Sequence, residues 1–186
     1  MSELTLFQKY QQSLQTNPVQ TKAATSGILY GLQELIALTV TKTADSKGLV
    51  KALKMILYGF FVSGPLGHYM YLELEKRFQG KVGAVASIGK LLASNLIISP
   101  ILNFLYLFAL AGIAGANAKQ ALGIAQSRIL GLMKISWVVF PLVQTFAFKN
   151  LPPELWLPFF NFVAFVFGTY INIKTKLANK KKEIKK

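Results

Sequence analysis

The sequence predicts an all-α fold: a polytopic membrane protein built as a bundle of about four transmembrane helices, with an additional interfacial or re-entrant helical segment. Hydrophobic residues make up 53% of the 186-residue chain and charged residues only 15%. The mean hydropathy of +0.42 is high for a soluble domain of this length. The charges lie between the apolar runs and at the C-terminus, because a Lys or Asp at the centre of a membrane helix costs about 2.5–3.5 kcal/mol on insertion scales.

The distribution of polar residues divides the chain into three parts. Residues 1–22 form a polar N-terminal segment, residues 23–173 a membrane-embedded helical domain, and residues 174–186 a lysine-rich C-terminal tail. The first part lacks the continuous apolar core of a secretory signal and the arginines of a mitochondrial transit peptide. The chain has no cysteine, which excludes disulfides, thiolate metal sites and thiol catalysis.

Ala23–Thr41 is the first predicted span, because its length is close to the ~20 residues that cross a bilayer. Gly27 and Gly31 have the GxxxG spacing that allows two helices to pack closely. Gln33 and Glu34 follow within the next turn, and a carboxylate at this depth requires a polar partner, water or a proton. Glu34 therefore either lines a cavity, makes a hydrogen bond between helices, or lies nearer the headgroups than this register implies.

Met55–Leu72 is the second predicted span, with a buried helix of a soluble core as the alternative. Gly64 and Pro65 in its middle predict a kinked helix held against neighbours, because proline removes a backbone hydrogen bond and glycine permits close approach. His68 follows within one turn. It either titrates near neutral pH and gates a polar path, or is a neutral side chain hydrogen-bonded to a neighbouring helix, which is the favoured interpretation.

Leu91–Ile113 is the third predicted span and contains more polar residues than the others. Asn95 and Asn103 lie about two turns apart and so roughly align on one side of the helix. A polar stripe on a membrane helix usually faces protein or water rather than lipid. The polar and helix-bending positions of this region are Lys90, Ser94, Asn95, Pro100 and Asn103.

Residues 114–134 are less hydrophobic and resemble an amphipathic helix near the interface, because polar residues recur every seven positions. The following run, Ile135–Phe148, contains Pro141 and Gln144 and has only 14 residues, which is short for a span. Joined to the residues before it, this run would cross the membrane, so the chain has four or five spans. Leu155–Ile173 is the last predicted span.

The orientation of the spans follows from the lysines and arginines. With four spans, 13 of them lie on the side of the termini and 8 on the other, which favours cytosolic termini. Five spans would place the termini on opposite sides. The tail has seven lysines and one acid, and we expect it to attract anionic lipid or a targeting receptor. Nucleic-acid binding is not expected, because no aromatic residues interleave these lysines.

Four stretches resemble the small integral membrane proteins of peroxisomes and the mitochondrial inner membrane, the family of peroxisomal membrane protein 2. Two are long motifs, TKAATSGILYGL at Thr21–Leu32 and YGFFVSGPLGHYMYLELE at Tyr58–Glu75. The others are spaced residues: Lys90, Leu96 and Pro100 in one, and Trp137, Pro141, Gln144, Leu151 and Pro152 in the other. The pattern departs from the family at Gln33-Glu34 and at Ser94-Asn95. If these positions line a pore in relatives, selectivity here should differ.

The resemblance implies a bundle of about four helices with cytosolic termini. For the peroxisomal branch it also implies an oligomeric pore that lets small metabolites pass, whereas the mitochondrial branch would place the protein in the inner membrane. The lysine-rich tail and the absence of a presequence favour the peroxisome. A membrane-protein import receptor of the peroxisome is then an expected partner of the tail.

Two hypotheses of different class follow. In the first, polar side chains converge on a wet path for small solutes through the bundle, and the small residues and prolines pack the helices. In the second, the same groups are interhelical hydrogen bonds of a structural or tethering protein. Catalysis, a metal and a cofactor are not expected, because paired carboxylates and a phosphate-binding glycine loop are missing. The pore-lining candidates are Gln33, Glu34, His68, Lys90, Ser94, Asn95, Asn103 and Gln144, and the packing candidates are Gly27, Gly31, Gly64, Pro65, Pro100 and Pro141.

Overall fold

The computed structural model describes residues 5–151 and 156–184, and this part of the chain is helical, without strands. The all-α prediction is confirmed. The helices, with π-helical stretches labelled η, are α1 (Leu6–Thr16), α2 (Pro18–Thr41), α3 (Ser46–Tyr58), η1 (Gly59–Ser63), α4 (Gly64–Phe78), α5 (Ala84–Ala93), η2 (Ser94–Ile98), α6 (Ser99–Ile113), α7 (Ala118–Asn150) and α8 (Trp156–Ile184).

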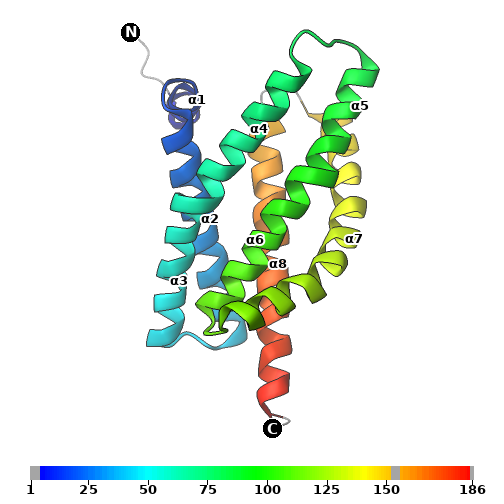
Figure 1. Cartoon of the computed structure of the whole chain (residues 1–186). Coiled ribbons are helices and arrows are strands. Elements are labelled where there is room, and N and C mark those ends of the chain that lie inside the picture. Colours follow the sequence, from blue (N-terminus) through cyan, green and yellow to red (C-terminus); the bar gives the residue numbers. More distant parts are fainter. Residues whose placement is uncertain (1–4, 152–155, 185–186) are drawn as a thin grey trace.

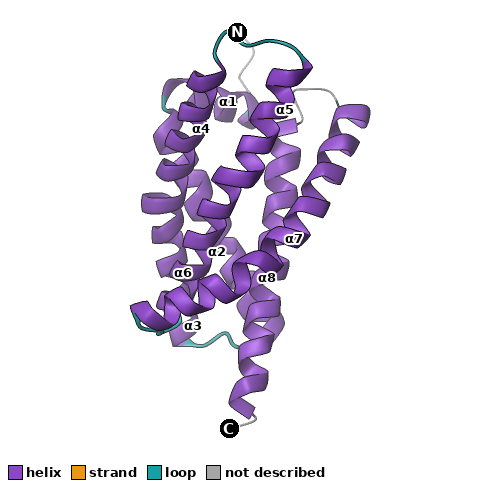
Figure 2. Cartoon of the chain, turned by 45° about the vertical axis from the view of Figure 1, so that its right-hand side comes forward, coloured by secondary structure: helices purple, strands orange, loops and turns teal. Residues whose placement is uncertain are grey.

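The helices form an elongated bundle in which α2 packs against α3, η1, α4 and α8 (Figure 1). The segments α3, η1 and α4 follow one another without a break and form one long bent helix, and α5, η2 and α6 form a second. Turning the bundle shows α7 leaning away from α8 at the upper end (Figure 2). The centre is filled by Met55, Tyr58, Tyr106, Leu107, Ala125 and Leu132.

Four helices of the described part are long and apolar enough to cross a membrane, in agreement with the predicted number, although the last predicted span, Leu155–Ile173, is not among them. They are Pro18–Thr41, Ser46–Phe78, Ala84–Ile113 and Ala118–Ala147. The first three begin before the predicted spans, because the residues that precede the predicted spans, polar and apolar alike, are helical too. For example, the Asp45 carboxylate accepts the Gly48 N–H at 2.6 Å and caps α3 well ahead of its apolar part.

Residues 118–148, which left the number of spans open in the sequence, belong to a single helix. The amphipathic residues after 117 and the run Ile135–Phe148 both belong to α7, which begins with a capping box formed by Asn117 and Gln120. Figure 1 shows the first turns of α7 crossing the lower end of the bundle and its later turns running upward beside α5. The interfacial segment and the additional crossing were therefore two parts of one element.

Helix α1 lies at the top of Figure 1 and the end of α8 at the bottom, so the first and last described helices mark opposite ends of the bundle. With α8 counted as a fifth crossing, this is the arrangement of the five-span alternative, in which the termini lie on opposite sides. The reason is that α7 returns the chain to the upper end before α8 begins. Helix α8 also continues as far as Ile184, so most of the lysine-rich tail prolongs the last predicted span.

The two bent helices share one feature, a π-helical stretch that is followed closely by a proline. Pro65 is the second residue of α4 and follows η1, and Pro100 is the second residue of α6 and follows η2. Proline cannot donate a backbone hydrogen bond and its ring crowds the preceding turn, so a wider turn there accommodates it within a continuous helix. Pro141 lies inside α7.

Glycines set the close approach of α2 to the first bent helix. A Cβ atom on Gly31 would lie 2.5 Å from Ile56 Cγ1, and one on Gly27 3.1 Å from the Ile56 carbonyl oxygen. A Cβ on Gly64 would meet the backbone of α2, 2.5 Å from Ala23 Cα. Any larger residue at these positions would push the helices apart.

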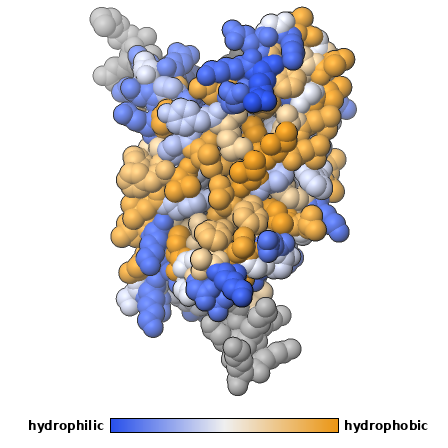
Figure 3. Space-filling model, in the orientation of Figure 1, coloured by the Kyte–Doolittle hydropathy of each residue, from blue (hydrophilic) through white to orange (hydrophobic). Residues whose placement is uncertain are grey.

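The surface has the pattern of a membrane protein. Hydrophobic residues cover the middle of the face in Figure 3, and hydrophilic residues gather at its upper and lower ends. Large apolar side chains of the membrane-crossing helices point outward, including Phe61 at 68% exposure and Leu142 at 67%. Burying such a surface requires hydrocarbon or another protein.

Candidate functional site

A polar cavity of about 260 Å³ lies inside the bundle between α2, α6 and α8, and is called the central cavity. Ser63 and Ser99 line it near the midpoints of the two bent helices. The rest of its wall is apolar and mainly aromatic, and no charged side chain is among the described residues that line it. Its hydroxyl and amide groups belong to Ser26, Tyr30, Gln33, Ser63, Ser99, Asn103 and Tyr106.

Two polar atoms on the wall of the central cavity are buried without a partner in the described part of the chain. They are Gln33 Oε1 and the Tyr106 hydroxyl. The other end of the Gln33 amide donates to the Phe165 carbonyl at 3.5 Å. Since an unpaired buried polar group costs about 1–3 kcal/mol, these atoms favour a solvated cavity, and about 260 Å³ is ample for several water molecules.

The other polar groups of the central cavity are held in place. The Tyr30 and Ser63 hydroxyl oxygens lie 3.2 Å apart and join α2 to η1. The Tyr30 ring stacks on Tyr106, with ring centroids 5.4 Å apart. Asn103 Nδ2 donates to the Ser99 carbonyl at 2.8 Å. The wall is therefore pre-formed, with fixed hydroxyls and one amide, Gln33, that has a free acceptor.

A second cavity, of about 230 Å³, lies toward the end of the bundle from which the tail extends, and is called the basic cavity. Its polar wall contains three cations and one carboxylate, and its other side is formed by apolar residues of α6, of α7 and of the turn between them. The charged and polar residues that line it are Glu34, Lys51, Arg128, Asn172, Thr175 and Lys176.

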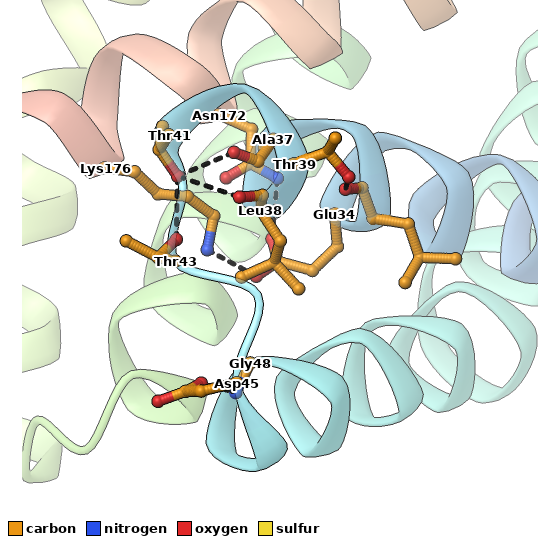
Figure 4. A network of polar contacts seen from close by, with 11 residues as sticks. Glu34, Ala37, Leu38, Thr39, Thr41, Thr43, Asp45, Gly48, Asn172 and Lys176 are labelled. Atoms are coloured by element: carbon orange, nitrogen blue, oxygen red, sulfur yellow. Dashed lines mark hydrogen bonds and ion pairs between the residues drawn. The ribbon is translucent and has the colours of Figure 1, made fainter.

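Glu34 is the organising group of the basic cavity, and its side chain is 1% exposed. Lys176 Nζ lies 2.5 Å from Glu34 Oε1, and Asn172 Nδ2 donates to Glu34 Oε2 at 2.7 Å. Figure 4 shows both partners reaching from α8 to the carboxylate on α2. Glu34 therefore makes an interhelical contact and also lines a cavity, so two of the interpretations of this residue apply together.

The predicted pore-lining residues do not converge on one path in this chain. Gln33 and Asn103 line the central cavity and Glu34 lines the basic cavity. In the described part of the structure, neither cavity is lined by the other candidates. These are His68, Lys90, Ser94, Asn95 and Gln144.

Several of the candidates that line neither cavity make short-range contacts elsewhere. Lys90 is drawn toward the end of the bundle, where its Nζ lies 2.6 Å from Glu75 Oε2. Ser94 and Asn95 each donate to the Leu91 carbonyl at 2.9 Å, so their side chains turn back onto their own helix. Ser and Asn in helices often bond to the preceding turn, and Asn103 does so too, so its place in the central cavity follows from its position on α6 and not from the bond. Gln144 is half-buried on α7.

His68 contacts the neighbouring helix, as its favoured interpretation proposed. Its Nδ1 lies 3.2 Å from Lys22 Nζ on α2. A lysine ammonium has no acceptor, so Nδ1 accepts the hydrogen bond and the ring is neutral in this arrangement. The contact joins α4 to α2 near the upper end of the bundle.

Sequence reasoning missed the residues that pair with or surround the predicted ones. Asn172 and Lys176 were assigned to a span end and a solvated tail, although their i,i+4 spacing places both on one face of a helix. That spacing, together with an unpaired carboxylate earlier in the chain, was the available signal. Tyr30 and Tyr106 gave no comparable signal, because aromatic residues are common throughout these spans.

Neither cavity has the composition of a metal site. In residues 5–151 and 156–184, no group of three or more His, Cys, Asp or Glu side chains is placed to hold a metal ion. What the two cavities can do is bind or pass polar solutes: the central one through neutral hydrogen-bonding groups, the basic one through positive charge.

Comparison with known proteins gives consistent relatives. The profile of the Mpv17/PMP22 family matches residues 111–172. The Woronin body membrane protein wscA of Aspergillus fumigatus is 44% identical over 171 residues, which cover 90% of this chain and 75% of that protein. The Woronin sorting complex protein of Neurospora crassa is 44% identical over 171 residues, covering 90% of this chain and 56% of that longer protein.

More distant relatives are named as peroxisomal proteins. Peroxisomal membrane protein 2 of Bos taurus is 29% identical over 169 residues, which cover 88% of this chain and 86% of that protein. No solved structure matches the chain.

Proposed function

Since the chain belongs to the Mpv17/PMP22 family of membrane proteins, we propose that it forms a passage for small polar solutes across the peroxisomal membrane. The location rests on the peroxisomal relatives and on the four helices long enough to cross a bilayer. The protein acts without catalysis or a cofactor in this proposal, and several copies assemble in the membrane.

The observation that carries the proposal is the central cavity. Hydroxyls and amides from α2, η1 and α6 gather near the middle of the membrane-crossing helices, where an apolar lining would be the cheaper solution. Neutral groups of this kind offer hydrogen bonds to a passing solute without holding it as a charge would. The unpartnered Gln33 Oε1 supplies an acceptor that such a solute or water would use.

In this proposal the described arrangement is the closed state. The central and basic cavities are separate, and consecutive residues of two helices face them from either side: Gln33 and Tyr106 line the central cavity, and Glu34 and Leu107 the basic one. In this proposal, joining the two cavities requires α2 and α6 to shift relative to α8 at this layer. Gly168 lets the Gln33 amide pack close to α8, since a Cβ atom there would lie 2.5 Å from Gln33 Nε2.

The test is ionic conductance of the purified chain in planar bilayers. We expect discrete conductance steps in the parent protein, reduced by Gln33→Leu and by Asn103→Leu, which replace polar groups of the central cavity. Asn95→Leu is the matched control, because Asn95 carries a similar amide that bonds to its own helix as Asn103 does, but it lines neither cavity. Silent bilayers, or an equal reduction by Asn95→Leu, would contradict a passage through this cavity.

A second candidate function is a structural or sorting role in a membrane. It is favoured by the two relatives at 44% identity, whose names refer to Woronin body membranes and a Woronin sorting complex. In this alternative the lysine-rich end of α8 recruits a partner, such as an import receptor or anionic lipid. A chain that is silent in bilayers, but that loses its membrane localisation or a bound protein when residues 180–186 are removed, would support it.

A further inference from the structure

We propose that the central cavity favours neutral solutes that carry hydroxyl groups, such as glycerol, over ions of similar size. The inference rests on the proposed passage and names the class of solute that the passage takes. It is carried by three features of the cavity: a lining without charge among the described residues, two buried polar atoms without a partner there, and a division into a polar and an apolar side.

The lining of the central cavity disfavours ions more than neutral molecules. None of the described residues that line it carries a charge, so an ion that enters loses water without meeting a counter-charge. A neutral solute exchanges hydrogen bonds with water for hydrogen bonds with the wall, which costs much less free energy. The preference is one of rate, so ionic conductance is still expected.

Two side chains on this wall offer hydrogen bonds that the described part of the chain leaves unused. Gln33 and Tyr106 are each 6% exposed, and neither Gln33 Oε1 nor the Tyr106 hydroxyl has a partner there. An amide oxygen only accepts hydrogen bonds, whereas a phenolic hydroxyl both donates and accepts them. A solute with several hydroxyl groups can therefore satisfy both side chains together.

The polar and apolar sides of the cavity come from different helices. Its hydroxyls and amides lie on α2, η1 and α6, whereas α7 and α8 contribute Phe140, Phe165 and Phe167. The rings of Phe140 and Phe167 meet edge to face, with centroids 5.8 Å apart. A polyol fits this division, because its hydroxyls can face the polar side while its CH groups pack on the rings.

The cavity has room for such a solute and part of its water. At ~30 Å³ for each molecule of liquid water, about 260 Å³ corresponds to roughly eight waters. A molecule of the size of glycerol therefore enters without displacing every water. The paired hydroxyls of Tyr30 and Ser63 extend the polar side beyond the two unpartnered groups.

The experiment uses the full chain reconstituted into liposomes and compares the uptake of radiolabelled glycerol with that of radiolabelled glycerate. Glycerate has the same carbon skeleton, with a carboxylate in place of a terminal alcohol group. After subtraction of the uptake by protein-free liposomes, glycerol uptake should exceed glycerate uptake by about tenfold or more. Ionic conductance with equal uptake of the two probes would retain the passage and overturn the preference. A chain that takes up neither probe and is silent in planar bilayers would overturn the passage as well.

Variants test whether the preference arises in this cavity. Tyr106→Phe removes only a hydroxyl group and should lower the protein-dependent uptake of glycerol severalfold, and Gln33→Leu should lower it to a similar extent. Tyr58→Phe is the matched control, because Tyr58 is also a buried tyrosine but lines neither cavity. Melting temperatures in detergent show which variants are folded. Unchanged uptake in folded Tyr106→Phe and Gln33→Leu, or an equal loss in Tyr58→Phe, overturns the proposal.

Discussion

The central and basic cavities are neighbours whose linings differ in charge. The first is lined by neutral hydroxyls and amides and the second by three cations and a carboxylate, although Gln33 and Glu34, adjacent in sequence, each line one of them. Charges are costly in the middle of a bilayer and much less so near its surface. The bundle thus keeps its polar neutral groups at mid-length and its ionic groups toward the tail end, and the two cavities can be altered independently.

The largest effect is expected from breaking the ion pair of the basic cavity. Lys176→Ala leaves Glu34 buried without its cation, and removing one partner of a buried pair typically costs about 3–5 kcal/mol. The measurement is the unfolding free energy in detergent micelles. The double variant Glu34→Gln/Lys176→Gln should recover much of the loss, and Lys174→Ala, an exposed lysine of the same helix, should change it little. A loss in Lys174→Ala as large as in Lys176→Ala would show that tail charge, and not the pair, stabilises the bundle.

A change confined to the central cavity should leave stability nearly unaffected while altering passage. Gln33→Leu removes an acceptor that has no partner and replaces it with an apolar group of similar size, so we expect a change in unfolding free energy of about 1 kcal/mol or less. Conductance should fall severalfold. A strong destabilisation would mean that the Gln33 amide is structural, and the separation between the two cavities would then fail.

A smaller effect is expected from narrowing the layer between the cavities. A Cβ atom at Gly168 would lie 2.5 Å from Gln33 Nε2, which is the end of a flexible side chain that can move aside. Gly168→Ala should therefore change stability by less than about 1 kcal/mol but displace the Gln33 amide into the central cavity. The readout is unitary conductance, with Gly131→Ala as the control, because no atom lies within 4 Å of a Cβ there. Identical conductance in the two variants would count against a role for this layer.

The smallest effect should come from weakening the charge of the basic cavity without touching the ion pair. Lys51→Gln should shift the ion selectivity of the pore toward cations, measured as the reversal potential in a salt gradient, and the shift should shrink as salt concentration rises. Lys54→Gln, which neutralises an exposed lysine on the same helix, is the control. Selectivity that is insensitive to Lys51 would place the basic cavity outside the path of ions.

The sequence was sufficient for the fold class and for the membrane helices, because apolar runs of fixed length are a direct consequence of bilayer thickness. It was not sufficient for the ends of those helices. The helix that contains Met55 begins at Ser46, directly after its cap Asp45. A hydropathy pattern detects only the residues that lie in lipid and not the helical residues before them. It also left the span count open, since α7 combines a polar first part with an apolar second part.

Only part of the candidate site could be predicted from the sequence. Gln33, Glu34 and Asn103 were identified because polar groups in apolar runs are conspicuous. Asn95 and Asn103 both donate to the carbonyl four residues earlier in their own helix, yet only Asn103 lines the central cavity, because the packing of the neighbouring helices decides which position borders a cavity. The partners of Glu34 lie 138 and 142 residues later, and such pairings are set by the packing of α8 on α2.

That long separation has a consequence for biogenesis. Helix α2 is completed by the ribosome when most of the chain, including the lysine that neutralises its carboxylate, has yet to be made. Until α8 arrives, Glu34 must remain in contact with water or be sheltered by another factor. The docking of the last helix therefore completes the surroundings of α2, because only then do Asn172 and Lys176 cover this carboxylate.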